Sequence, residues 1–122
     1  MNYSEKLKSC SDEYPFDYWL EDYKEGIGLY SEEHCSTVKA IFDELIASLI
    51  NLGKDAPEPA KLEAFKTAVY SLNFIRNSDP SLIETMEREE FCELFDKIAS
   101  AALLESKKFG DGEGIASEWR EW

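Results

Sequence analysis

The feature that most restricts the fold is an apolar stripe between Ser31 and Gly53. Large apolar side chains recur there at intervals of three and four residues, which places them on one face of an α-helix. Ser31 is a suitable N-cap and Gly53 a suitable terminator, so the sequence predicts a helix between them. Two additional apolar positions widen the stripe, and we therefore expect this helix to be the central, most buried element. The stripe contains Cys35, Val38, Ile41, Phe42, Leu45, Leu49 and Leu52, and is widened by Ile46 and Ile50.

Other apolar residues follow the same period. A helix is expected from Tyr14-Pro15, since proline is tolerated in a first helical turn, and it should end at Gly26 and Gly28. Another helix is expected from about Pro59 to the break at residues 77–80. The apolar face of the first of these two helices contains Phe16, Trp19, Leu20 and Tyr23, and that of the second contains Leu62, Phe65, Val69 and Leu72.

A last long helix is expected to begin between residues 80 and 86 and to keep an apolar inner face from Phe91 through Leu103. Ser81 and Glu84 have the spacing of a capping box, and Thr85 is a competing N-cap. No segment shows the alternation of apolar and polar residues that predicts a strand. Because the connecting segments are short, we expect one all-α domain over residues 1–122, a small antiparallel bundle of about four helices.

Residues 105–122 lack this period but end in large apolar side chains. Three glycines between residues 110 and 114 precede a segment that contains Ile115, Trp119 and Trp122. Burial of such a side chain stabilises a fold by about 1.5–3 kcal/mol, so we expect this C-terminal tail to pack against the bundle. Two interpretations stay open: both tryptophans belong to the core, or one of them is the anchor of a binding interface.

The chain carries 26 acidic and 13 basic side chains, a formal net charge of −13, and the surplus lies in its two flanks. Residues 1–34 contain nine acidic and three basic residues, residues 35–76 five of each, and residues 77–122 twelve and five. This charge opposes binding to nucleic acid or an anionic membrane and accelerates encounter with a basic partner. The N-terminal residues lack the apolar region of a signal peptide, and no apolar run is long enough to span a bilayer, so we expect a cytoplasmic protein.

No group of residues has the pattern of a catalytic, cofactor or metal site. His34 is the single histidine, and its neighbour Cys35 would point about 100° away on a helix, so a Cys–His pair is not expected. The glutamates between residues 87 and 93 lack the Glu-x-x-His spacing of dinuclear metal bundles, and no glycine-rich loop has the context that binds phosphate. We therefore expect a non-enzymatic protein without a cofactor.

The three cysteines have no CxxC spacing and predict neither a disulfide framework nor a zinc site. Cys35 and Cys92 lie on or beside apolar stripes, where a free thiol behaves as a small buried hydrophobe. Cys10, which lies among Ser and Lys, is the candidate for an exposed thiol.

Residues 12–33 mix carboxylates with tyrosines, a composition suited to a partner surface rich in Lys and Arg. Carboxylates set the association rate and the register, while the rings supply contact area at little cost in side-chain entropy. The alternative is that Trp19 and Tyr23 face the core and the acidic residues only solvate the outer side. The candidate partner-binding residues are Asp17, Tyr18, Glu21, Asp22, Glu25, Glu87, Glu90, Glu93 and Trp119.

The last forty residues also show a family resemblance. Residues 83–90 (Ile-Glu-Thr-Met-Glu-Arg-Glu-Glu) lead a helix, and residues 112–122 end in Trp-Arg-Glu-Trp. Together these segments resemble small acidic bacterial immunity proteins that are encoded beside secreted polymorphic toxins, including those of contact-dependent inhibition systems. The resemblance implies a cytosolic protein that binds and neutralises a cognate toxin, commonly a basic nuclease. The alternative is a non-enzymatic adaptor or regulatory subunit that binds another basic protein, and the oligomeric state is left open.

Overall fold

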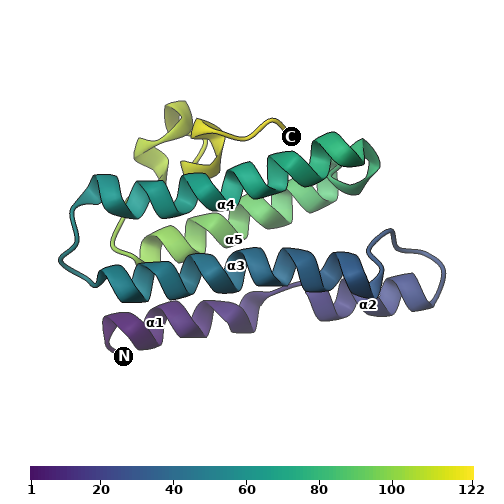
Figure 1. Ribbon diagram of the computed structural model, residues 1–122, viewed down its shortest axis with the longest axis horizontal. Helices are drawn as coiled ribbons and strands as arrows, with labels where there is room; N and C mark the ends of the chain where they lie inside the picture. Colours follow the sequence, from purple (N-terminus) through teal and green to yellow (C-terminus); the bar gives the residue numbers. More distant parts are fainter.

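Helices account for all the regular structure in this computed structural model, which describes residues 1–122. Helices α1 and α2 lie in line along one side of α3 and together form one rod of a four-rod bundle, and successive rods run antiparallel (Figure 1). The predicted all-α small helical bundle is confirmed. The five α-helices are α1 (Tyr3–Ser9), α2 (Phe16–Lys24), α3 (Glu32–Leu52), α4 (Glu58–Ser78) and α5 (Thr85–Ala101).

Helix α3 has the predicted bounds and contacts three other helices, but it is not the most buried element, because six of its 21 residues are buried, as are six of 21 in α4 and five of 17 in α5. The Ser31 side chain accepts a hydrogen bond from the backbone N–H of His34 at 3.2 Å, and the helix ends where Gly53 adopts a φ of +87°. The helix packs against α1, α2 and α4. Leu52 at its end is exposed and Ile41 and Ile50 are half-buried, so the stripe is narrower at its edges than expected. Its buried residues are Cys35, Val38, Phe42, Leu45, Ile46 and Leu49.

The start of α5 lies within the predicted interval, but the predicted capping box does not form. Pro80 begins a short 3₁₀ turn, in which the backbone N–H of Ser81 donates to Asp79 at 3.2 Å. Glu84 takes the N-cap position instead, and its backbone N–H donates to the side chain of Glu87 at 3.0 Å. At the other end the inner face stops one residue early, because Leu103 adopts a positive φ and is exposed.

Helix α1 was not predicted from the sequence. Asn2 caps it by accepting a hydrogen bond from the backbone N–H of Glu5 at 2.8 Å, and Leu7 is its only fully buried side chain up to Ser9. Tyr3 and Leu7 are the only large apolar residues in this helix, and a single pair is too few to establish a period. Cys10 directly follows this helix and is buried, so the expectation of an exposed thiol at this position is wrong.

The core is rich in aromatic rings at the junction of α2, α3 and α5. The ring of Phe42 lies 5.9 Å from that of Phe16, 5.8 Å from that of Phe91 and 4.8 Å from that of Phe95, measured between centroids. Each pair of rings at these separations contributes about 0.5–1.5 kcal/mol in addition to the free energy gained by burying their apolar surface. This cluster therefore holds the three helices together. None of the helices has the length and hydropathy needed to cross a membrane.

Candidate functional site

The C-terminal tail packs on the bundle, and its two tryptophans differ in how far they are buried. Ile115 and Trp122 are buried, and the Trp122 ring lies 5.8 Å from that of Phe91. The Ser106 hydroxyl donates to Asp96 and accepts the backbone N–H of Ile115 at 2.9 Å, which fixes the start of the last segment. Trp119, by contrast, is only half-buried.

The acidic residues predicted to bind a partner come together in part. Tyr18 on α2 is 46% exposed, and the pKa of its phenol is raised first by the carboxylate of Glu90 and then by burial and by the carboxylates of Asp22 and Glu87. Side chains of α2 and α5 therefore share one electrostatic environment. Glu93 continues this group along α5, since its carboxylate acts on the pKa of Glu90. We call Tyr18, Asp22, Glu87, Glu90 and Glu93 the acidic surface.

Glu90 has the least favourable environment of this group. Burial raises the pKa of its carboxyl, the nearby indole N–H of Trp19 opposes that rise, and the carboxylates of Glu87 and Glu93 add to it. One carboxylate oxygen of Glu90 and the Nε1 of Trp19 are both enclosed, yet the two do not reach hydrogen-bonding geometry, and neither has another partner. The environment of Glu90 in the folded protein thus disfavours the ionised form of its carboxyl group.

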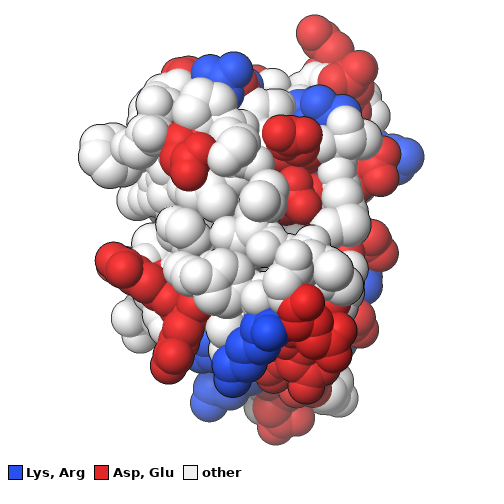
Figure 2. Space-filling model, turned by 90° about the vertical axis from the view of Figure 1, so that its right-hand side faces the viewer, with Lys and Arg blue, Asp and Glu red and all other residues white.

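Basic side chains compensate only one edge of the acidic surface. Lys97 lies 3.1 Å from Glu13 and 3.6 Å from Glu93, and these residues border a hollow of about 170 Å³ beside Glu90. Glu87 and Glu90 form no ion pair, because none of the five ion pairs in the structure includes them. At the end of the bundle that carries the α2–α3 loop, carboxylates form dense clusters around an uncharged area, with fewer basic groups (Figure 2).

The remaining α2 residues divide between core and surface. Trp19 is 3% exposed and packs against Tyr30 and Phe91, with ring centroids 4.6 Å and 5.4 Å away, whereas Tyr23 is exposed. The alternative in which both rings face the core is therefore right for Trp19 and wrong for Tyr23. Asp17, Glu21 and Glu25 are exposed. Asp17 borders a different hollow, shared with Lys39 and Asp43 of α3.

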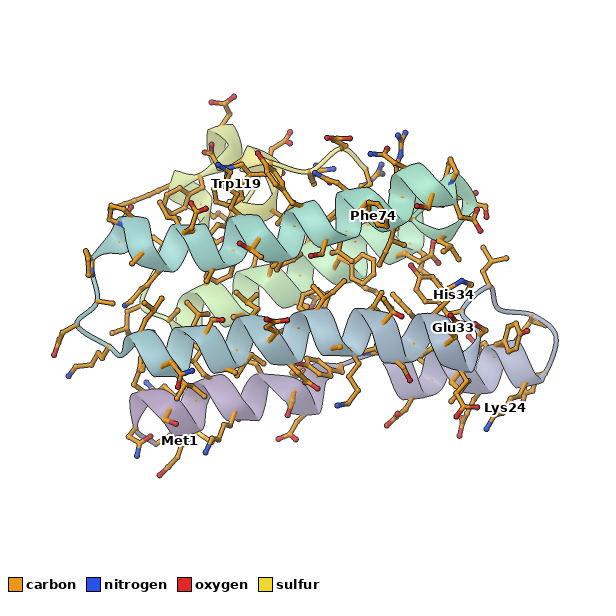
Figure 3. The ribbon with its side chains drawn as sticks, in the orientation of Figure 1. Met1, Lys24, Glu33, His34, Phe74 and Trp119 are labelled. Carbon is orange, nitrogen blue, oxygen red and sulfur yellow. The ribbon has the colours of Figure 1, made fainter.

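Trp119 lies away from α2, which carries Tyr18 and Asp22 of the acidic surface. In Figure 3 it is above α4, whereas α2, whose end is marked by Lys24, is at the opposite lower corner of the molecule. Trp119 borders instead a hollow that it shares with Tyr70 and Phe74 of α4. The structure thus does not gather all the predicted partner-binding residues onto one surface, since Asp17 and Trp119 border separate hollows.

Tyr70 and Phe74 were not anticipated as functional residues. They are 51% and 74% exposed on α4. Their sequence signal is a spacing of four residues that is out of phase with the buried stripe of Phe65, Val69 and Leu72. The periodicity therefore predicts only that these two side chains face outward. Their position beside Trp119, in one hollow, is known from the structure alone.

Comparisons of this chain with protein-family models, with curated proteins and with solved structures found no match.

Proposed function

We propose that this protein is an immunity protein, which binds a cognate basic toxin of the nuclease type in the cytoplasm and neutralises it by stoichiometric occlusion. The observation that carries the proposal is the acidic surface, in which Lys97 pairs with Glu93 but no cation pairs with Glu87 or Glu90, and above all Glu90. A carboxylate that folding disfavours, which lies beside like charges and takes part in no ion pair itself, is typical of a site kept for function at a cost in stability. A basic partner would supply the missing cations.

The chemistry of the acidic surface suits occlusion rather than catalysis. A positively charged nuclease cleft that binds phosphates also attracts an array of carboxylates, and such complementarity raises the association rate and selects the partner. The exposed ring of Tyr18 adds apolar contact area among the charges, and its hydroxyl, which is protonated at neutral pH, can donate a hydrogen bond to a partner. The toxin itself is suggested by the resemblance of residues 83–90 and 112–122 to immunity proteins.

The proposal is tested by co-expression with the product of the adjacent upstream reading frame. We expect a one-to-one complex that copurifies at moderate salt, and growth that depends on this protein when the neighbour is expressed. A complex with a neighbour that is not toxic would favour the adaptor or regulatory subunit. The absence of both a complex and toxicity would contradict the proposal.

The site is tested by charge reversal with a matched control. In the double variant Glu87→Lys and Glu90→Lys, we expect the association rate to fall by at least about tenfold at low salt and its salt dependence to weaken. Glu58→Lys with Glu63→Lys on α4 changes the net charge equally at exposed positions. If both double variants slow association by the same factor, net charge alone acts and the acidic surface is not the interface.

A further inference from the structure

A second surface lies between the outer face of α4 and the C-terminal tail. It contains a hollow of about 440 Å³, and Phe74 is among the most exposed large apolar side chains of the molecule. Phe74 and Trp119 both lie on the α4 side of the bundle, away from α2 (Figure 3). We call this surface the aromatic patch, formed by Tyr70, Phe74 and Trp119 with Glu118 and Glu121 at its edge.

The aromatic patch is held in place by a buried side chain. The carboxamide of Asn73, which is 5% exposed, donates to the backbone carbonyl of Trp119 and accepts the backbone N–H of Glu121, both at 2.9 Å. This pair of hydrogen bonds clips the tail onto α4 on either side of residue 120. The backbone that carries the Trp119 ring is therefore fixed before any partner arrives, which lowers the entropic cost of binding.

The two carboxylates at the edge are held but not neutralised. Glu118 accepts the backbone N–H of Gly110 at 2.7 Å, and Glu121 accepts a hydrogen bond from Asn77 at 3.1 Å. Neither carboxylate takes part in an ion pair. The hollow therefore combines exposed aromatic faces with unpaired negative charge.

The nearby cations already have contacts within the molecule, and one of them lies against a ring of the patch. The ammonium of Lys66 lies 5.4 Å from the centroid of the Tyr70 ring, and the Arg76 guanidinium donates to Asn77 at 3.2 Å. Arg120 lies 5.7 Å from the Trp122 ring and 3.7 Å from Glu113. The contact between Lys66 and Tyr70 also shows that a face of this patch accepts a cation.

We propose that the aromatic patch is a second binding site, which takes an Arg- or Lys-bearing segment of a partner protein. The cation lies against the rings and pairs with Glu118 or Glu121, while the aliphatic part of the same segment covers Phe74. A second copy of this chain is a poor occupant, because it brings the same glutamates and the same net charge of −13. The site lies on a different side from the acidic surface and does not require the partner to be a toxin.

The test uses the full-length ¹⁵N-labelled protein and two peptides at low salt. One is acetyl-Gly-Leu-Arg-Leu-Arg-Gly-amide, and the other replaces both arginines by citrulline, which has the same shape without the charge. We expect the arginine peptide to shift the indole N–H signal of Trp119 and the backbone amides around Phe74, and not the indole signal of buried Trp19. The citrulline peptide should bind at least about fivefold more weakly.

Variants of the patch have a matched control. Phe74→Ala is expected to raise the dissociation constant of the arginine peptide by at least about fivefold, whereas Ile27→Ala, at a side chain that is 75% exposed in another part of the molecule, should leave it unchanged. Glu118→Gln with Glu121→Gln keeps the size of both side chains and should weaken binding similarly.

Several results would overturn the inference: no shift at Trp119, equal affinity for both peptides, or unchanged affinity in Phe74→Ala. Shifts at Tyr18 and Glu90 instead would assign the peptide to the acidic surface, which would remove this site and leave the proposed function standing. Signals of the patch that change with protein concentration alone would indicate self-association and would also overturn it.

Discussion

Two buried polar side chains each join parts of the chain that are distant in sequence. Asn73 binds both sides of residue 120, and the Lys61 ammonium donates to the backbone carbonyls of Lys54 and Ala102 at 2.9 Å. Both side chains are nearly fully enclosed. Removing either side chain would take a hydrogen bond from two backbone groups at once, so each side chain is worth more than an exposed polar residue.

The prediction for Asn73 concerns the tail. Asn73→Ala leaves a backbone carbonyl and a backbone N–H without their partners, which is expected to lower the free energy of unfolding by about 1–3 kcal/mol. The amide of Glu121 should also lose protection in hydrogen exchange. Asn77→Ala is the control, since Asn77 is exposed and bonds only side chains. Equal loss of stability in the two variants would show that the hydrogen bonds of Asn73 to the tail have no special weight.

The prediction for Glu90 concerns pH. Because burial and like charges raise its pKa in the folded state, folding favours the protonated carboxyl, and stability is lost as the pH rises through the folded-state pKa. Glu90→Gln should therefore stabilise the protein at pH 7, by roughly 0.2–0.5 kcal/mol, since solvent screens much of the effect. The gain should vanish below about pH 4, where the carboxyl is protonated in both states.

Thermal unfolding of both proteins across this pH range measures the effect. A Glu90→Gln variant that is less stable at pH 7 would show that ionised Glu90 supports the fold. Greater stability together with weaker binding of the basic partner would instead indicate a residue kept for function.

Among the elements, α4 places one cation near the C-terminal ends of α5 and α3. Lys61 on α4 reaches Ala102 directly after α5 and Lys54 in the loop after α3. A positive charge is favourable at the C-terminal end of a helix, where carbonyl groups lack intrahelical partners. α4 is thereby joined to both helices at one end of the bundle.

Lys61→Met tests this contact, because it keeps the length of the side chain but removes the charge and the donors. We expect a loss of about 2 kcal/mol in the free energy of unfolding, since two carbonyls lose charged hydrogen-bond donors. Chemical denaturation measures the loss. Lys66→Met on the same helix makes the same chemical change without such carbonyl contacts and should alter stability by less than about 0.5 kcal/mol. Similar stability of Lys61→Met and the native protein would contradict the role of Lys61.

At the scale of the whole molecule, the net charge of −13 opposes compaction. Five ion pairs offset part of this repulsion, and at least one member of each is exposed. Exposed pairs are worth about 0–1 kcal/mol each. Repulsion among the remaining carboxylates is therefore the larger long-range effect at neutral pH.

This balance predicts how salt changes stability. Raising NaCl from about 10 mM to 150 mM at pH 7 should increase the midpoint of thermal unfolding, because the added ions screen the repulsion between carboxylates that lie more than about 8 Å apart. Near pH 4.4, the isoelectric point of the sequence, the same addition should have little effect. A midpoint that falls with salt at pH 7 would show that the ion pairs outweigh the repulsion.

The sequence also indicated part of the candidate site. Asp22, Glu87, Glu90 and Glu93 were selected by their charge, and Tyr18 by its position among carboxylates. The distinction of Glu90 among these residues was not predictable, because it arises from enclosure beside Trp19 and from neighbours on another helix. The aromatic patch was missed for the same reason, since its rings come from α4 and from the tail, about 45 residues away in the chain.

The sequence by itself determined the helical class, the bounds of α3 and the approximate bounds of α2, α4 and α5. Caps, prolines, glycines and the 3.6-residue period act within a few residues, so they can be recognised without knowing the fold. Only the tertiary structure decided that α1 forms, that Trp122 is buried while Trp119 faces a hollow, and that the acidic flanks meet at Tyr18. These outcomes depend on which distant surfaces pack together, and long-range packing leaves no periodic trace in a single sequence.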